Sequence, residues 1–305
     1  MSHVKLTRYE GNPILAPIPE HPFEAQNVSN AGAVDVDGVV HILYRAEGYE
    51  KRNPYTKDWP VTSLGLATSK DGYTIDRRLP EAVIGPEPFG EFGEHGIQDP
   101  RIARIDDTYY ITTAAVSRWG DRVILYSTRD WKHFTKEAVI QPEQEMRTAG
   151  MFPERFGDDF CFLLRPQPNM WIGYTPDFKH WCDCRPIWKI KRNTWYGRKL
   201  GLAATPIRQD DAWLLFWHGK DDTLDGTYSL GVMWLDLDDP SRIIRVQDEP
   251  ILTVETEYER AGYYPNVVYA CGVVERDDTY LVYYGCADRV LALATVPVSD
   301  CRLGG

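Results

Sequence analysis

The chain has 305 residues, of which 43% are hydrophobic, so it can bury a sizeable core in one large domain or two ordinary ones. Its formal net charge of -11 argues against nucleic acid and anionic membrane surfaces as partners, because a negative field repels both. No stretch approaches the ~20 apolar residues of a membrane helix, and the N-terminal segment lacks the apolar run of a signal peptide.

The six cysteines do not form a recognisable metal or redox motif. Cys182 and Cys184 are separated by a single residue, which is not the spacing of a zinc knuckle or a dithiol centre. We therefore expect reduced thiols, most of them buried as small hydrophobic side chains, in a cytoplasmic protein.

Short runs of β-branched and aromatic residues recur between polar turns along the whole chain, and no long stretch keeps a helical period. This pattern predicts an all-β protein. Five segments share a polar tight turn followed by a strand-forming run. In chain order they are residues 37–45 (DGVVHILYR), 106–114 (DDTYYITTA), 157–165 (GDDFCFLLR), 210–218 (DDAWLLFWH) and 277–285 (DDTYLVYYG).

Each of these segments is followed by a second predicted strand, for example VILYSTRDWKHF after the second segment and MWIGYTPDFKHW after the third. Five strand-hairpin-strand units, roughly 50 to 70 residues apart, predict a five-bladed β-propeller. One blade cannot bury its faces alone, so residues 1–305 are expected to form a single catalytic domain. A β-sandwich would explain the strands but not the repetition.

We expect the five repeated segments to supply the inner strands of the propeller, and the residues that end them are of interest because inner strands and the loops after them converge on a central axis. They are Arg45, Ala114, Arg165, His218 and Gly285. Two arginines and a histidine at equivalent positions predict a polar axial pocket, in which His218 would contact substrate. The alternative is that each pairs with a local carboxylate such as Glu47 or Glu154.

Asp99 lies seven residues before the second repeated segment, in the sequence Asp99-Pro100-Arg101. Proline fixes its own φ and biases the preceding residue toward an extended conformation, so we expect Asp99 on a stiff segment, suited to a general acid. Ordinary turn chemistry is the alternative for an Asp-Pro pair.

Further polar and aromatic side chains occur near the predicted blades. They are Asn27, Ser29, Asn30, Tyr263, Tyr264, Asn266 and Asp288. Aromatic rings with hydrogen-bonding groups beside them suit a sugar, whose C–H face packs on a ring while its hydroxyls need donors and acceptors. Packing between blades is the alternative role for any one of these rings.

Short motifs in a fixed order resemble glycoside hydrolase family 130, the β-mannoside phosphorylases and related β-mannosidases. The motifs are NPIL, NAGAV, LYRAEG, LGLATSKDG, QDPRI, MFPE, LLRP, WHG, PNVVY and YYGCAD, and they extend over nearly the whole chain. The family fold is a five-bladed propeller, in agreement with the repeats.

The resemblance implies that Asp99 is the general acid, protonating the glycosidic oxygen through the 3-hydroxyl of the mannose. Inorganic phosphate then attacks the anomeric carbon from the opposite face and gives α-mannose 1-phosphate. The residues that match the family's sugar-binding positions are Asn30, Arg45, Arg101 and Asp288. Inorganic phosphate is a co-substrate, and no other cofactor and no metal is expected.

Phosphorolysis requires a cradle for an anion, whereas inverting hydrolysis requires a second carboxylate that activates water. Arg122 and Arg147 fall where the family has phosphate-binding cations, and Arg165 follows Leu164, which replaces a histidine. Gln98 replaces the glutamate that precedes the acid. We therefore expect Arg122, Arg147 and Arg165 to bind phosphate and favour a phosphorylase; a hydrolase would use a glutamate as its base, with Glu47 and Glu154 as candidates.

Two other classes compete with this interpretation. Furanosidases of the invertase and arabinanase type need an Asp-Pro near the N-terminus, where this chain has Asn12-Pro13. A lectin that kept the pocket and lost the chemistry would not need Asp99. The linkage, the leaving sugar and the oligomeric state, a homo-oligomer included, are left open, and the segment from Glu50 to Thr62 is expected to shape the site of the leaving sugar.

Overall fold

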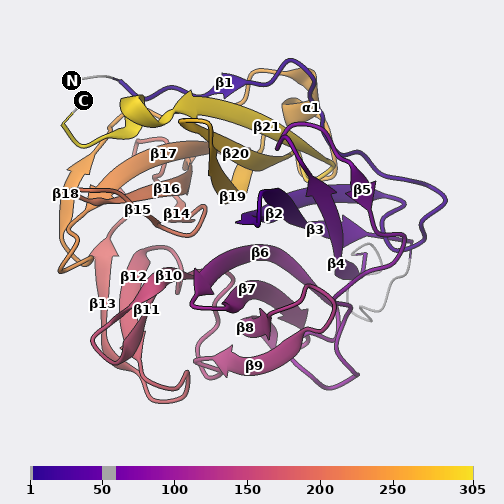
Figure 1. Cartoon of the computed structure of the whole chain (residues 1–305), viewed down its shortest axis with the longest axis horizontal. Coiled ribbons are helices and arrows are strands. Elements are labelled where there is room, and N and C mark those ends of the chain that lie inside the picture. Colours follow the sequence, from indigo (N-terminus) through magenta and orange to yellow (C-terminus); the bar gives the residue numbers. More distant parts are fainter. Residues whose placement is uncertain (1–2, 50–59, 305) are drawn as a thin grey trace.

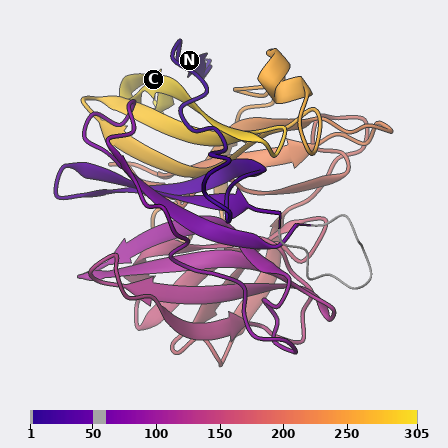
Figure 2. The ribbon, with the colours of Figure 1, turned by 90° about the vertical axis from the view of Figure 1, so that its right-hand side faces the viewer.

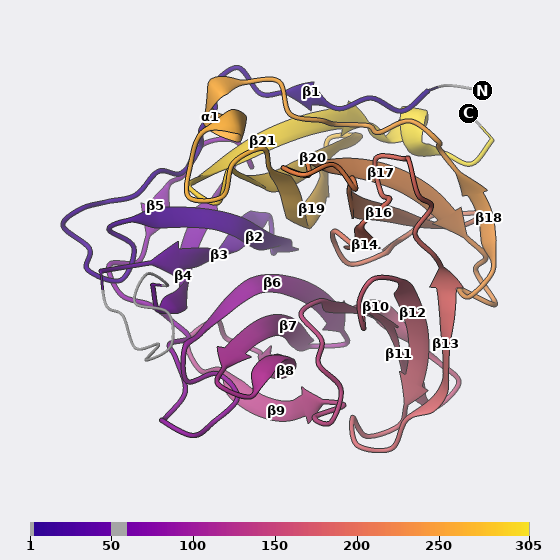
Figure 3. The ribbon, with the colours of Figure 1, turned by 180° about the vertical axis from the view of Figure 1, so that it is seen from behind.

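The computed structural model describes residues 3–49 and 60–304, and in this part of the chain almost all regular structure is β-strand. The strands form five groups, antiparallel within each, arranged around a central axis (Figure 1). A parallel pair between Thr62 and Gly96 joins the first two groups into one eight-stranded sheet. The predicted five-bladed propeller is thus confirmed. The view from behind gives the same order of the groups around the axis (Figure 3).

The blades follow one another along the chain. The first consists of β2 (Asn27–Val36), β3 (Val39–Glu47), β4 (Thr62–Ser69) and β5 (Arg77–Arg78), and the second of β6 (Gly96–Ile105), β7 (Thr108–Ser117), β8 (Gly120–Thr128) and β9 (Thr135–Ile140). The third consists of β10 (Ala149–Phe156), β11 (Asp159–Leu164), β12 (Met170–Thr175) and β13 (Cys182–Trp188). The fourth consists of β14 (Lys199–Leu202), β15 (Ile207–Arg208), β16 (Trp213–Lys220), β17 (Tyr228–Leu235) and β18 (Ile243–Val246).

The fifth blade contains both the first and the last strands of the chain. It consists of β19 (Val268–Arg276), β20 (Thr279–Cys286), β21 (Val290–Pro297) and the N-terminal β1 (Thr7–Arg8), which pairs with β21. A short helix, α1 (Glu257–Arg260), precedes β19, and a 3₁₀ turn, η1 (Val298–Cys301), follows β21. The two ends of the described chain therefore lie close together at one rim (Figures 1 and 2).

The polar turns recognised in the sequence form the hairpins that open the blades. In the β2–β3 hairpin, Asp37 and Gly38 both have positive φ, 51° and 84°, as a two-residue type I′ turn requires. Asp277 and Asp278 do the same between β19 and β20, with φ of 47° and 55°. The strand after each turn is the second of its blade: the innermost strands precede the repeated segments, which corrects the expectation that these segments supply the inner strands.

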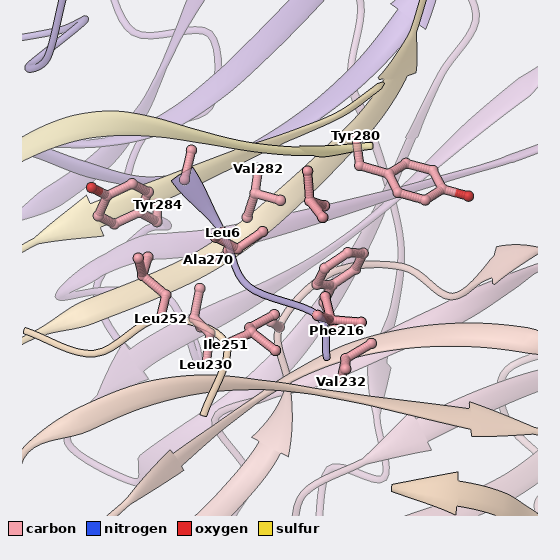
Figure 4. Packing of buried hydrophobic residues seen from close by; sticks show 14 of the residues in the cluster. Leu6, Phe216, Leu230, Val232, Ile251, Leu252, Ala270, Tyr280, Val282 and Tyr284 are labelled. Carbon is pink, nitrogen blue, oxygen red and sulfur yellow. The ribbon is translucent and has the colours of Figure 1, made fainter. Parts of the chain in front are cut away.

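Apolar side chains between neighbouring blades hold the ring together. Between the fourth and fifth blades, Phe216 and Val232 pack against Tyr280 and Val282, and Leu6 from the N-terminal segment completes the cluster (Figure 4). Each fully buried side chain of this size contributes about 1.5 to 3 kcal/mol relative to an exposed one. Four of the six free cysteines are buried, as expected, while Cys182 and Cys184 are exposed.

Among the described residues, the structure contains no helix long and apolar enough to cross a membrane. Residues 50–59 of the segment expected to shape the leaving-sugar site lie outside the described residues.

Candidate active site

A cavity of about 240 Å³ lies where the blades meet, and all five blades contribute to its lining. Charged groups dominate it. The described residues that line it and carry charge are Arg45, Glu47, Asp99, Asp121, Arg147, Arg165, Lys199 and Asp288. The predicted polar pocket is therefore present, and Arg45 and Arg165, at the ends of two repeated segments, both line it.

Bulges in two innermost strands direct Asn30 and Asp99 toward the cavity. The register of β2 shifts between Ser29 and Gly32, and that of β6 shifts between Gln98 and Arg101. Asn30 and Asp99 lie within these bulges with φ of 45° and 55°. Aspartate and asparagine tolerate this left-handed region better than other side chains, and bulges often re-aim a side chain near an active site. The extended conformation expected for Asp99 before proline is wrong, because the bulge requires a positive φ.

Close approach of the fifth blade keeps Asn30 in place. A Cβ atom on Gly285 of β20 would lie 2.0 Å from Oδ1 of Asn30 and 2.7 Å from its backbone nitrogen. Only glycine therefore fits at the end of this repeated segment, which explains why the sequence has no polar side chain there.

Opposite charges and a hydrogen bond surround the carboxylate of Asp99, which is buried. Asn30 donates from Nδ2 to Oδ1 of Asp99 at 2.8 Å, and Nη1 of Arg45 lies 3.7 Å from the same oxygen. Burial raises the pKa of Asp99, but the charges of Arg45 and Arg147 and the Asn30 hydrogen bond outweigh it and hold this pKa below its usual value. Asp99 is therefore ionised at neutral pH.

Arg45 joins three carboxylates. Besides Asp99, it forms an ion pair with Glu47, and its Nη1 lies 3.5 Å from Oδ2 of Asp288. Glu47 is buried and also accepts a hydrogen bond from Nδ2 of Asn27 at 2.8 Å. Burial raises the pKa of Glu47, and Asp288 adds to this, against the lowering effect of Arg45. These groups form an acidic side of the cavity.

Glu154, the other candidate base, lies elsewhere. Its carboxylate is partly exposed, forms an ion pair with Arg208 at 3.6 Å and does not line the cavity. Of the two glutamates considered from the sequence, only Glu47 therefore borders the site.

Arg101 lies beneath the cavity rather than in its lining. Its guanidinium donates to the backbone oxygen of Asp99 at 3.0 Å, to that of Ala203 at 2.8 Å and to the hydroxyl of Tyr269 at 3.0 Å. The bulge between Gln98 and Arg101 breaks the usual alternation, so Asp99 and Arg101 do not present side chains side by side. Among the described residues, Arg101 is thus not part of the cavity lining, where direct contact with the sugar was predicted. Its guanidinium instead holds the backbone of Asp99 and the side chain of Tyr269 in place.

The opposite side of the cavity is cationic. Arg147, Arg165 and Lys199 line it together with Tyr228, whose ring centroid lies 4.9 Å from Nζ of Lys199. Arg165 is only 2% exposed, and among the described residues its Nε and Nη1 have no hydrogen-bond partner. Burial, and then the charges of Arg165, Arg147 and Lys220, lower the pKa of Lys199 to about 7. Three cations this close together, one of them the buried Arg165 without partners on Nε and Nη1 among the described residues, are unfavourable unless an anion binds there.

The neutral amide of Gln98 and the carboxylate of Asp121 orient Arg147, which lies between the acidic and the cationic side of the cavity. Its Nη2 donates to Oε1 of Gln98 at 2.6 Å, and its Nη1 lies 3.2 Å from Oδ2 of Asp121. Gln98, which replaces the family's glutamate, thus holds the guanidinium without neutralising its charge.

Arg122 and His218 do not line the cavity. Nε of Arg122 donates to the backbone oxygen of Pro142 at 2.5 Å, and its guanidinium lies over the Phe92 ring. His218 is fully buried with its ring centroid 4.3 Å from that of Tyr269. Burial, and then Arg165 and Arg101, lower the pKa of His218 well below its usual value, so the ring is neutral. Neither side chain is therefore among the described residues that line the cavity, where phosphate binding by Arg122 and substrate contact by His218 were predicted, and His218 packs behind the lining residue Tyr269.

Several lining residues were not singled out from the sequence: Gln167, Lys199, Tyr228 and Tyr269. Lys199 begins the short innermost strand of the fourth blade, which precedes the repeated segment and has no pattern of its own. A search for the strand before each repeated segment would have found it.

Comparisons with known proteins agree with this geometry. A family model described as β-1,4-mannooligosaccharide phosphorylase, of glycoside hydrolase family 130, matches residues 7–301. The chain belongs to this family. This confirms the family predicted from the sequence. It also confirms the prediction that the protein is an enzyme of the glycoside phosphorylase type.

Two curated relatives come from Thermoanaerobacter sp. (strain X514). A 1,2-β-oligomannan phosphorylase is 37% identical, with 98% of this chain and 99% of that protein covered. A β-1,2-mannobiose phosphorylase is 36% identical, with 96% and 97% covered. The solved structure of a β-1,2-mannobiose phosphorylase from Listeria innocua, in complex with β-1,2-mannobiose, superposes with a TM-score of 0.86 at 26% identity and covers 97% of this chain and 98% of that one.

Proposed function

We propose that this protein is an inverting β-mannoside phosphorylase that releases α-mannose 1-phosphate from β-1,2-linked manno-oligosaccharides. The observation that carries the proposal is the buried Arg165, whose Nε and Nη1 have no partner among the described residues, beside Lys199 and Arg147 in the axial cavity. Phosphate is the co-substrate whose charge and acceptor oxygens such a cluster suits. The linkage rests on the names of the two Thermoanaerobacter relatives and of the Listeria structure.

The acidic side of the cavity binds the sugar and holds the general acid, and the cationic side binds phosphate. On the acidic side, Asn30, Arg45 and Asp288 bind the hydroxyls of the mannose that is transferred, and Asp99 is the general acid. On the cationic side, Arg147, Arg165 and Lys199 hold phosphate, with Tyr228 beside them. A phosphate oxygen forms a bond to the anomeric carbon while the glycosidic bond breaks on the opposite face, which inverts the configuration. Inorganic phosphate is the only cofactor-like species that the reaction needs, and no metal takes part.

The proton passes to the leaving oxygen. Asp99 gives its proton, through the 3-hydroxyl of the mannose, to the glycosidic oxygen, and the shortened sugar departs with a new hydroxyl. Because Arg45 and Arg147 lower the pKa of Asp99, the acid must regain a proton before the reaction. Phosphate beside Arg147 offsets one of these charges, so its binding raises the pKa of Asp99 and favours the protonated acid in the ternary complex.

A product assay on purified protein tests the proposal. β-1,2-Mannobiose is incubated with and without millimolar inorganic phosphate, and mannose 1-phosphate and free mannose are quantified. We expect one mannose 1-phosphate for each bond cleaved and no cleavage without phosphate. Absence of mannose 1-phosphate for β-1,2-, β-1,3- and β-1,4-linked substrates would overturn it.

Hydrolysis by the same cavity is the second candidate, and the position of Glu47 is the observation that favours it. Glu47 borders the cavity, but its carboxylate is engaged by Arg45 and by Asn27. A carboxylate held in this way is poorly placed to activate water. Free mannose formed at one rate with and without phosphate would favour hydrolysis over phosphorolysis.

A further inference from the structure

Asp121 places a carboxylate in the wall of the axial cavity, next to the cations that are proposed to bind phosphate. It is the second residue of β8 and comes directly after the β7–β8 turn. Side chains alternate along a strand, so Asp121 lines the cavity while the next residue, Arg122, contacts Pro142 and the Phe92 ring. The reaction proposed above does not use this carboxylate.

Two contacts hold Asp121 beside Arg147. Oδ2 of Asp121 lies 3.2 Å from Nη1 of Arg147, and the backbone oxygen of Asp121 accepts a hydrogen bond from the backbone nitrogen of Met146 at 3.1 Å. Burial lowers the pKa of Arg147, but the charge of Asp121, and then that of Asp99, outweighs it and raises this pKa. Backbone and side-chain contacts together therefore fix the carboxylate relative to the guanidinium.

Arg147 has donors left for an anion despite this contact. A guanidinium has five N–H donors, and within residues 3–49 and 60–304 Nη1 gives one to Asp121 and Nη2 gives one to Oε1 of Gln98. An anion that accepts from the other N–H groups has the carboxylate of Asp121 as its neighbour. An ionised carboxylate accepts hydrogen bonds but donates none, so the neighbouring oxygen of the anion must carry a proton, or the two negative charges repel each other.

Phosphate and sulfate differ in this proton. Both are tetrahedral anions of similar size, and slightly above neutral pH both are mainly dianions. Phosphate then still has a P–OH group, whereas sulfate has no hydrogen to donate. A carboxylate in the wall of an anion site therefore favours phosphate and disfavours sulfate, because specificity arises from a repulsive contact with the wrong ligand as well as from a bond to the right one.

We propose that Asp121 makes the anion site selective for a protonated tetrahedral oxyanion, phosphate or arsenate, against sulfate. Its carboxylate accepts a hydrogen bond from the P–OH group of bound phosphate and repels sulfate. The same contact turns the protonated oxygen toward Asp121, so that an unprotonated oxygen attacks the anomeric carbon. This inference rests on the proposed function and adds to it the residue that determines which anion reacts.

Inhibition kinetics test the inference. Initial rates of mannose 1-phosphate formation from β-1,2-mannobiose, in slightly alkaline buffer, give the KM for phosphate and the inhibition constants Ki for sulfate and for arsenate competing with it. We expect Asp121→Asn to lower the ratio of the sulfate Ki to the phosphate KM about 10- to 100-fold, because a charged hydrogen bond to phosphate is lost and the repulsion of sulfate is relieved. The ratio for arsenate, which keeps a proton at this pH, should change less than about twofold.

Glu145→Gln is the matched control. Glu145 lines a neighbouring surface cavity together with Asp121 and Arg147, but it is not among the described residues that line the axial cavity. The variant removes a negative charge close to the site without removing an acceptor for phosphate. We expect the ratio for sulfate to change less than about twofold, since solvent screens a charge at the surface.

Equal changes in the phosphate KM and the sulfate Ki of Asp121→Asn would show that Asp121 only orients Arg147, and would overturn the inference while leaving the proposed function intact. If the wild-type protein forms no mannose 1-phosphate, the proposed function fails. Calorimetric titration of phosphate and of sulfate into both proteins then still tests the selectivity. A loss of preference for phosphate in Asp121→Asn supports the inference, and an unchanged preference, or no binding of phosphate to the wild-type protein, rejects it.

Discussion

Asn30 and Asp99 lie 69 residues apart in the chain and belong to different blades, yet Nδ2 of the first donates to Oδ1 of the second at 2.8 Å. Each occupies a bulge of an innermost strand with a positive φ. The ring of blades therefore brings together two locally irregular backbones, and the hydrogen bond between their side chains holds the carboxylate in the lining of the cavity.

Replacement of the acid is the most direct prediction. Asp99→Asn keeps the size and the bulge of the residue but has no proton to give, so we expect normal folding and a kcat lower by about 10² to 10⁴. Steady-state rates and thermal unfolding check this together. A variant with near wild-type turnover would show that another group protonates the leaving oxygen.

Removal of the Asn30 amide should change the pH profile as well as the rate. The hydrogen bond favours the ionised form of Asp99, so Asn30→Ala raises the pKa of Asp99. The acid then stays protonated to higher pH, and the alkaline limb of kcat/KM for mannobiose moves upward. A lower rate with an unmoved limb would contradict this coupling.

Loss of a cation from the phosphate side should act on one substrate only. We expect Arg165→Met to raise the KM for phosphate about 10- to 100-fold, since it removes charge-assisted hydrogen bonds to the anion, and to leave mannobiose binding nearly unchanged. Initial rates with each substrate varied in turn separate the two effects.

Arg122→Met is the matched control for this measurement, because its guanidinium contacts backbone oxygens and the Phe92 ring outside the cavity. Less than a threefold change in the KM for phosphate is expected. A change as large as that of Arg165→Met would restore Arg122 to the phosphate site.

If Lys199 binds phosphate as proposed, phosphate binding should depend on pH near neutrality. Its pKa of about 7 means that it is protonated below this pH and loses its charge above it. Phosphate affinity should therefore weaken as the pH rises from 6 to 9, whereas Lys199→Arg keeps the charge and should weaken less. Calorimetric titration of both proteins across this range checks the prediction, and the comparison cancels the change in charge of phosphate itself. Parallel profiles would exclude Lys199 from phosphate binding.

The sequence predicted the fold well because the hairpin turns are local. Asp37-Gly38 and Asp277-Asp278 specify tight turns by their own conformational preferences, and the repeated strands follow them. The innermost strands were harder to recognise. They hold irregular polar residues such as Asn30 and Asp99, and bulges remove the alternation by which strands are usually found.

The site was predicted only where its residues follow a motif. Arg45, Asp99, Arg147 and Arg165 line the cavity as expected, whereas Arg101 lies beneath it. Arg122 and His218 point away from the cavity because of the strand face on which each lies and because of their contacts, with Pro142 and Phe92 for Arg122 and with Tyr269 for His218. Sequence alone does not predict these contacts. Lys199 resembles an ordinary surface lysine until the third and fourth blades bring it beside Arg165.

The pairing of β1 with β21 places residues near both chain ends in a single blade at one rim of the ring. Cavity residues are thus held by the circular arrangement of the blades rather than by their linear order. A chain whose present ends are linked and whose new ends are opened at the exposed β7–β8 turn, near Trp119, should rebuild the same cavity. The ring of blades, and the cavity within it, should therefore not depend on the position in the ring at which the chain begins and ends.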